Sequence, residues 1–239
     1  MGEEHLVIDG RYCGPPDSGN GGYTCGLLAR IIGGPSEVTL RRPPPVSRPL
    51  VVRRPAEGRV ALFDGDEVVA EGFAARPEIN LPAPVSFEDA AEAAGRYLGF
   101  ALHPFPTCFV CGPQRGEGDG LRIFPGPVTG LEVVAAPWKP DSTVAGPDGM
   151  VEPEFLWAAL DCPGAFANGF PQTPMVLGRL AAELATPVRS GQRCVVVGWS
   201  EGSEGRKRFA GTSLVGDDGE ILALARATWI SLAPIDSSV

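Results

Sequence analysis

Residues 151–167 read Val151-Glu-Pro-Glu-Phe-Leu-Trp-Ala-Ala-Leu-Asp-Cys-Pro-Gly-Ala-Phe-Ala167, an apolar run of helical character with one carboxylate, Asp161, near its middle. The residues three and four positions from Asp161 share its face on a helix and carry no charge: Trp157, Ala158, Gly164 and Ala165. A carboxylate on an apolar face loses solvation, and its pKa rises as it does in many general bases and nucleophiles. The alternative is an Asp that faces a wet groove or caps a second short helix at Pro163.

Strand-like segments surround this helix along the chain. One precedes it at 130–135, and others follow at 175–184, 193–198, 207–215 and 221–232. The first half has the same order, with a strand near 6–12, a helix at 21–32, and strands at 37–41, 50–54, 59–63 and 67–73. Asp64-Gly65 predicts a hairpin turn, and residues 86–100 predict a connecting helix.

Short segments of the two halves also match. Pro45-Val46 before 50–52 corresponds to Pro187-Val188 before 194–197, and residues 62–70 resemble residues 214–223. These matches favour an internal duplication over chance recurrence of Val and Gly, with repeats at 1–85 and 108–239 and a connecting helix and linker at 86–107. A helix followed by long antiparallel strands must bury its apolar face against them. We therefore expect an α+β fold in which each half wraps a sheet around one central helix.

The predicted helix at 21–32 begins with Asn20-Gly21-Gly22. Asn20 or Ser18 could cap it, and the two glycines leave backbone N–H groups unshielded at the positive end of the helix dipole. Such a helix start is suited to an anion or an oxyanion. The alternative is a flexible loop in which the glycines only supply positive φ angles.

Composition excludes several classes of function. A net charge of −9 argues against nucleic acid or an anionic membrane as the main partner. The chain has no apolar run long enough to span a membrane, and Met1-Gly-Glu-Glu-His5 does not resemble a secretion signal, so we expect a cytoplasmic protein. Neither a GxGxxG motif nor a P-loop is present, and no cofactor is expected.

Six cysteines do not predict a disulfide framework in a reducing compartment. Cys108 and Cys111 have the spacing of metal ligands, and His103 lies just upstream. A closed zinc site needs four ligands, however, and no second CxxC or His pair is present. We therefore expect buried thiols and no metal.

The run Cys108-Phe-Val-Cys-Gly-Pro-Gln-Arg115, with Gly120-Leu-Arg122 after it, resembles the opening of many hot-dog-fold thioesterase-like proteins. In the PaaI-like and related acyl-CoA thioesterases, a His-Gly-Gly or Asn-Gly-Gly helix start is followed within the helix by an acidic nucleophile or general base. In this chain Asp161 matches the acidic position, but Glu152-Pro153 replaces the start. Asn20-Gly21-Gly22 matches the start, but Ala29 stands at the acidic position.

The resemblance implies a fused double hot-dog with one composite site. Asp161 would be the catalytic residue, Asn20, Gly21 and Gly22 would bind the oxyanion or substrate, and the opposite pairing of Ala29 with Glu152 would be inert. The acyl chain would lie between the two central helices near Tyr23, Leu27, Phe155 and Trp157. The expected substrate is an acyl-CoA or acyl-carrier thioester.

The sequence thus predicts a thioesterase-like hydrolase. A non-catalytic acyl- or acyl-CoA-binding protein of the same fold is the alternative, and a hydratase would need an Asp/His pair that neither helix start contains. Candidate contacts to the CoA phosphates are basic residues on predicted strands, although such residues are commonly only solvated: Arg53, Arg54, Arg206, Lys207 and Arg208. Homodimer formation through free sheet edges is left open.

Overall fold

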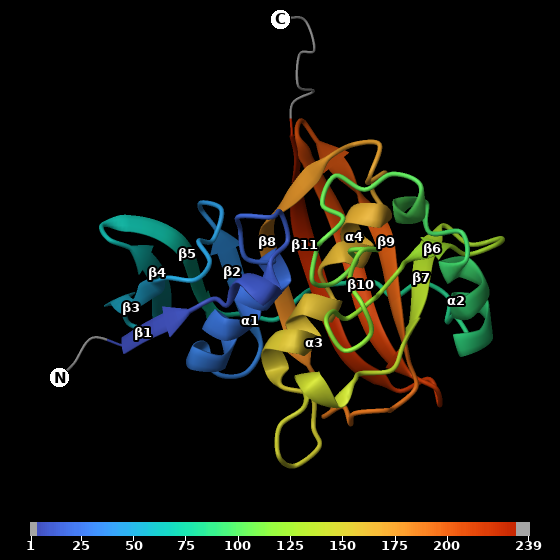
Figure 1. Cartoon of the computed structure of the whole chain (residues 1–239), viewed down its shortest axis with the longest axis horizontal. Coiled ribbons are helices and arrows are strands. Elements are labelled where there is room, and N and C mark those ends of the chain that lie inside the picture. The colour runs from blue at the N-terminus through green and yellow to red at the C-terminus, as the bar shows by residue number, and fades with distance from the viewer. Residues whose placement is uncertain (1–3, 233–239) are drawn as a thin grey trace, which may run out of the picture.

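The computed structural model describes residues 4–232, so the outer ends of the two predicted repeats, residues 1–3 and 233–239, lie outside it. Within that range one antiparallel sheet curves around the central helices (Figure 1). The first half contributes β1 (Glu4–Val7), β2 (Ser36–Leu40), β3 (Pro49–Ala56), β4 (Arg59–Asp64) and β5 (Glu67–Ala74). The second half contributes β6 (Gly126–Pro127), β7 (Val133–Trp138), β8 (Met175–Leu184), β9 (Cys194–Glu204), β10 (Lys207–Gly216) and β11 (Ile221–Ser231).

The helices are α1 (Gly21–Ile32), α2 (Phe87–Ala94), α3 (Pro153–Ala159) and α4 (Cys162–Phe166), together with short 3₁₀ turns η1 (Gly10–Tyr12), η2 (Leu98–Phe100) and η3 (Ser142–Val144). Helices α1 and α3 pack against each other at the centre of the molecule, where the two halves meet (Figure 1). α4 lies over strands β9, β10 and β11 of the second half. The predicted α+β class is confirmed.

The two halves of the sheet have the same strand order when each is followed inward. The first half runs β1-β3-β4-β5-β2, and the second, inside the short outer strand β6, runs β7-β9-β10-β11-β8. β2 and β8 join the halves as an antiparallel pair in which Thr39 lies opposite Arg179. The matched segments 62–70 and 214–223 form the tips of the equivalent hairpins β4–β5 and β10–β11. This equivalence is what the proposed internal duplication requires.

The most important local difference from the sequence prediction is at 152–167, where two helices replace one. α3 ends at Ala159, and Asp161 occupies the N-cap position of α4 with φ −79° and ψ −81°. Pro163 is the cause, because proline within a helix lacks the N–H and clashes with the preceding turn, whereas the first turn of a new helix accepts it. The break turns the Asp161 side chain away from a regular helix face.

Other predicted elements also have shifted ends, and the strand expected at 193–198 extends to Glu204. The helix expected at 86–100 ends at Ala94, although Ser86 caps it as expected by accepting a bond from the Asp89 N–H at 3.0 Å. The strand expected near 6–12 stops at Val7 and gives way to η1, where Asp9 caps the turn. The strand expected at 130–135 begins three residues later, at Val133.

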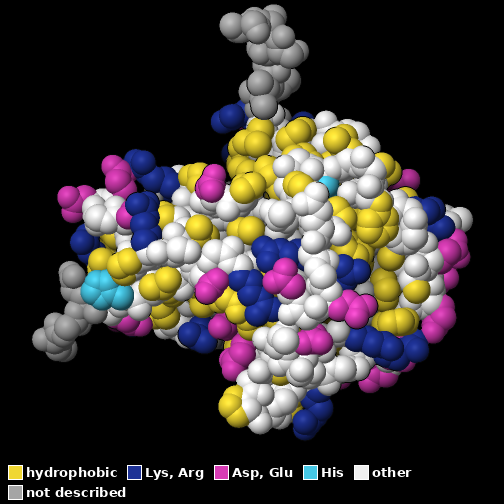
Figure 2. Space-filling view, in the orientation of Figure 1, with side chains coloured by type: hydrophobic (Ala, Val, Ile, Leu, Met, Phe, Trp, Pro, Cys, Tyr) yellow, Lys and Arg dark blue, Asp and Glu magenta, His cyan; other side chains and the backbone are white. Residues whose placement is uncertain are grey.

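Charged side chains of both signs lie interspersed on the face shown in Figure 2 and do not form a patch of one sign. Among residues 4–232, none of the helices combines the length and the apolar character that crossing a membrane would require.

Candidate active site

The start of α1 is organised by one side chain, Asn20. Its Oδ1 accepts a hydrogen bond from the Tyr23 N–H at 2.9 Å, which caps the helix, and this bond orients the amide so that Nδ2 points the other way. The Asn20 carbonyl oxygen accepts from the Thr24 N–H at 3.0 Å. Because Asn20 is only 2% exposed, both ends of its amide are committed to protein groups.

Asp161 meets this helix start from the other half of the chain. Its Oδ2 accepts hydrogen bonds from Asn20 Nδ2 at 2.8 Å and from the Gly22 N–H at 3.0 Å. The carboxylate is 2% exposed, and its second oxygen, Oδ1, is buried with no hydrogen-bond partner among residues 4–232. The two groups that sequence reasoning assigned to one composite site are therefore in direct contact across 141 positions of the chain.

Burial dominates the electrostatics of this carboxyl. Loss of solvation raises the pKa of Asp161 from its ordinary value of 3.8 to about 7, and the nearby Cys108 sulfur adds to the increase. The hydrogen bonds from Gly22 and Asn20 favour the ionised form and lower the pKa, but they do not cancel the effect of burial. Asp161 is thus a carboxyl group that changes protonation state near neutral pH, as a general base must.

Glycine at position 22 is required by the approach of the two halves. A Cβ there would lie 2.6 Å from Cβ of Asp161 and 2.7 Å from the carbonyl oxygen of Trp157. The same holds one turn later, where a Cβ on Gly26 would lie 2.6 Å from Cα of Glu154. These glycines let α1 and α3 pack closely enough for a backbone amide to reach the carboxylate.

A cavity of about 370 Å³ opens beside Asp161. Asn20 and Gly21 line it on the side of α1, and the segment 41–44 after β2 contributes Arg41 and Arg42. Its apolar wall comes from the 103–111 loop, α4 and the strands β8 and β11, and consists mainly of Phe105, Phe166, Phe170, Met175, Leu177 and Trp229. The cavity therefore offers an apolar compartment next to one titratable carboxyl, within the usual size range of small-ligand sites.

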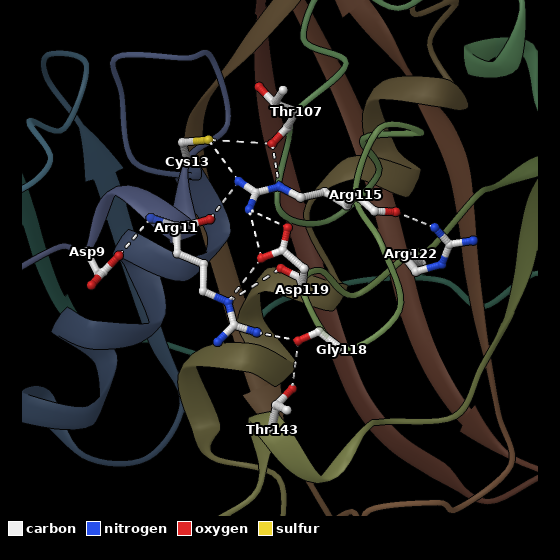
Figure 3. Close-up of polar contacts among 9 residues, drawn as sticks. All are labelled: Asp9, Arg11, Cys13, Thr107, Arg115, Gly118, Asp119, Arg122 and Thr143. Atoms are coloured by element: carbon white, nitrogen blue, oxygen red, sulfur yellow. Dashed lines mark hydrogen bonds and ion pairs between the residues drawn. The ribbon is translucent and has the colours of Figure 1, made fainter.

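The loop that carries Cys108 and Cys111 is fastened to the first half by an arginine pair (Figure 3). The guanidinium of Arg115 donates to the carbonyl oxygens of Thr107 at 2.8 Å and Arg11 at 2.7 Å, and to the Cys13 sulfur at 3.2 Å. Arg11 in turn donates to the carbonyl oxygen of Gly118. These bonds tie the 107–118 loop to the turn at η1, so the cavity wall spans both halves of the molecule.

Not all of the sequence-predicted site residues lie at the cavity. Tyr23 and Trp157 are buried in the core; Tyr23 stacks on Tyr12 with ring centroids 4.3 Å apart and also packs against Phe155. The cavity does not lie between the central helices, where the acyl chain was expected, because Gly22 and Gly26 bring those helices into contact. The open space lies on the other side of Asp161.

The predicted phosphate contacts also lie elsewhere. Arg53 covers the ring of Phe63, Arg54 pairs with Glu4, and Lys207 pairs with Glu204, while none of the five predicted basic residues lines the cavity. Arg41 and Arg42 do line it, and they were not singled out in the sequence. The sequence feature that could have identified them is their position directly after a central strand, just before the proline run 43–45.

The sequence placed His103 just upstream of Cys108 and Cys111 but did not reveal that Cys162 joins them. All four residues line the cavity. Burial lowers the pKa of His103, and hydrogen bonds from the thiols of Cys111 and Cys162 hold the pKa of Cys108 well below its usual range. No pattern of spacing could connect Cys162 with a pair more than fifty residues earlier.

No known family profile matches the sequence, and no curated protein matches it. Several solved structures are similar to this one over nearly its whole length. An acyl-CoA thioesterase II, TesB2, of Mycobacterium marinum aligns with 97% of this chain and 93% of its own, at a TM-score of 0.61 and 13% identity. A TesB protein of Mycobacterium avium subspecies paratuberculosis aligns over 97% and 93% of the two chains, at a TM-score of 0.60 and 15% identity.

A conserved protein of unknown function with a hot-dog fold, from Alicyclobacillus acidocaldarius, aligns over 98% of this chain and 94% of its own, at a TM-score of 0.60 and 13% identity. These alignments extend over nearly the whole chain and include both halves of the sheet. At such low identity they establish the fold, and the expected double hot-dog architecture is confirmed.

Proposed function

We propose that this double hot-dog protein hydrolyses an acyl thioester at the composite site formed by Asp161 and the start of α1. One observation carries the proposal: Oδ2 of Asp161 is held by Asn20 and the Gly22 amide, whereas Oδ1 is buried and lacks a partner in the described part of the chain. A buried polar atom without a partner is costly, and in a cavity it is a group prepared for a ligand or a reacting molecule.

The chemistry follows from this arrangement. Oδ1 of ionised Asp161 accepts a proton from a water molecule, whose oxygen attacks the thioester carbonyl carbon. The carbon–sulfur bond then breaks, the leaving thiolate takes the proton back from Asp161, and the products are a carboxylic acid and a thiol. In this scheme Asn20 and Gly22 position the base, since both of their donors are taken by Oδ2.

The oxyanion donor in this scheme is the Gly21 N–H. The N–H groups of Gly22, Tyr23 and Thr24 are bound by Asp161 and Asn20, so Gly21 is the remaining first-turn residue, and it lines the cavity. A backbone donor at the positive end of a helix stabilises the charge that develops on the carbonyl oxygen, and loss of one such donor typically costs about 3–4 kcal/mol in the transition state.

The proposed substrate class is an acyl-CoA or acyl-carrier thioester. The apolar cavity wall suits an acyl group. Arg41 and Arg42 line the cavity and pair with Glu71 and Glu67 of β5, and in this proposal their guanidinium groups exchange those carboxylates for the phosphates of the substrate. The structurally similar protein from M. marinum is described as an acyl-CoA thioesterase II, which supports the same class. We further propose that the protein acts in the cytoplasm and has two fused repeats, as its sequence predicts.

The test compares Asp161→Asn with Glu154→Gln. Glu154 is the matched control, since it is also a buried carboxyl with one unpartnered oxygen among the described residues, but it does not line the cavity. Free-thiol release from acyl-CoA substrates of increasing chain length should fall by about 100-fold or more in Asp161→Asn and stay near the wild-type rate in Glu154→Gln. Unchanged turnover in Asp161→Asn would remove Asp161 from the mechanism. Saturable binding without thiol release by the wild-type protein would favour the acyl-binding alternative.

A further inference from the structure

Three buried cysteines meet at the edge of the cavity. Cys108 and Cys111 come from the loop after η2, and Cys162 is the first residue of α4. Their sulfur atoms all lie within 4.8 Å of one another, and the Cys108 and Cys162 sulfurs are 3.8 Å apart. Two thiolates on one tetrahedral Zn²⁺, with Zn–S bonds of about 2.3 Å, lie roughly 3.8 Å apart. The cluster therefore already has nearly the spacing of three zinc ligands.

The loop around the first two cysteines is a tight turn of the kind that presents sulfur to a metal. The Gly112 N–H donates to the Cys108 carbonyl oxygen at 2.9 Å and closes the turn. Glycine is needed at 112, because a Cβ there would lie 2.5 Å from the backbone nitrogen of Cys108.

His103 completes the surroundings of the cluster as a donor to sulfur. Its Nδ1 accepts a hydrogen bond from the Phe105 N–H at 3.0 Å, which places the proton of the neutral ring on Nε2. Nε2 lies 3.4 Å from the Cys111 sulfur. The ring thus donates to the cluster, and a fourth metal ligand must come from another source.

We propose that Cys108, Cys111 and Cys162 bind one Zn²⁺ ion through three thiolates, with the fourth position facing the cavity. Each cysteine releases its thiol proton as its sulfur binds the ion, and no electron is transferred. All three residues line the cavity, from which a water molecule can reach the fourth position. The ion would join the 103–111 loop to α4 and so fix two walls of the cavity. This inference is independent of the proposed hydrolysis, because it concerns metal binding alone.

The experiment is a Co²⁺ titration of the full chain, reduced with a phosphine and stripped of metal by a chelator. The expected result is one Co²⁺ per chain, with a sulfur-to-cobalt charge-transfer band and the intense visible bands of tetrahedral cobalt, all removed by added Zn²⁺. Cys162→Ala should weaken binding by about 100-fold or more. Cys194→Ala is the matched control, a buried cysteine of β9 outside the cluster, and should bind like the wild type.

The wild-type titration decides the question without any variant. Absence of a sulfur-to-cobalt band in the wild-type protein would overturn the proposal. The proposal would also be overturned if Cys162→Ala and Cys111→Ser bound Co²⁺ with the same affinity and gave a band of the same strength as the wild type. Cys111→Ser is included in case Cys162→Ala does not fold. Circular dichroism of each variant establishes that its fold is intact before the titration.

Discussion

Asp161→Asn should stabilise the protein while it removes the proposed base. The folded protein holds this carboxyl at a pKa of about 7, against an ordinary value of 3.8. For an acid whose folded pKa is raised, stability is greatest below the unfolded pKa and is lost as pH rises towards the folded one. The difference corresponds to about 4 kcal/mol at pH 8 and about half of that at pH 5.5.

Asparagine is a close substitute for the protonated acid. Its Oδ1 can accept the two bonds that Asn20 and Gly22 now donate, and its NH₂ group takes the place of the unpartnered oxygen, as the acid O–H would. The variant should therefore match the protonated wild type and avoid the destabilisation that ionisation causes. The other titratable groups around Asp161 are the thiols of Cys25 and Cys108 and that of its neighbour Cys162.

The assay is urea unfolding of metal-free, reduced protein at pH 8 and pH 5.5. We expect Asp161→Asn to exceed the wild type by about 4 kcal/mol at pH 8, or roughly 10 °C in melting temperature, and by about half of that at the lower pH. Glu154→Gln should show no such gain, because Glu154 pairs with Arg30 at 3.1 Å. If the two proteins had the same free energy of unfolding at pH 8, or if their difference did not change with pH, the account of Asp161 as a destabilising carboxylate would be refuted.

Two further predictions concern catalysis and substrate binding. Asn20→Ser should keep the helix cap, because serine is as good an N-cap as asparagine, yet lose the donor to Asp161. Thiol release should fall by about 100-fold, while the melting temperature should fall less than in Asn20→Ala, which also loses a cap of about 1 kcal/mol. Equal rates in Asn20→Ser and the wild type would make Asn20 a cap only. Arg42→Ala should raise KM for acyl-CoA by about 10-fold without changing KM for a short thioester that lacks the nucleotide. Arg54→Ala, on β3 and paired with Glu4, is its control, and parallel changes for both thioesters would argue against a phosphate contact.

Helices and strands were predictable from the sequence where the apolar pattern of a segment matches the face that the segment buries in the fold. Helix α1 and the hairpins β4–β5 and β10–β11 follow from apolar spacing and turn residues, and the predicted limits of α1 match the observed ones. The contact between Asp161 and Asn20 was also predictable, because each half lacks the part of the motif that the other half has. It required the resemblance, since no local pattern links positions 141 residues apart.

The location of the cavity was not predictable, because it depends on how closely two helices pack. The sequence gives Gly22 and Gly26 one turn apart on a predicted helix, but it does not give the distance between that helix and the next. In the structure Gly22 and Gly26 let α1 pack directly on α3. The two helices therefore leave no space between them where the acyl chain was expected. The cavity then forms where the cysteine loop and α4 cover strands β8 and β11, which depends on contacts between segments far apart in the chain.

Asn20 connects the separate features of this site. Its capping bond to Tyr23 determines which way its amide points, and that orientation aims Nδ2 at Asp161, with the Cys108 sulfur 4.0 Å away. A requirement of local helix formation thereby fixes a donor for a carboxylate in the other half of the chain. Because both donors converge on Oδ2, the hydrogen bonds hold the carboxylate in place without occupying Oδ1. The site keeps one oxygen rigid and the other available, which is the arrangement that a positioned general base needs.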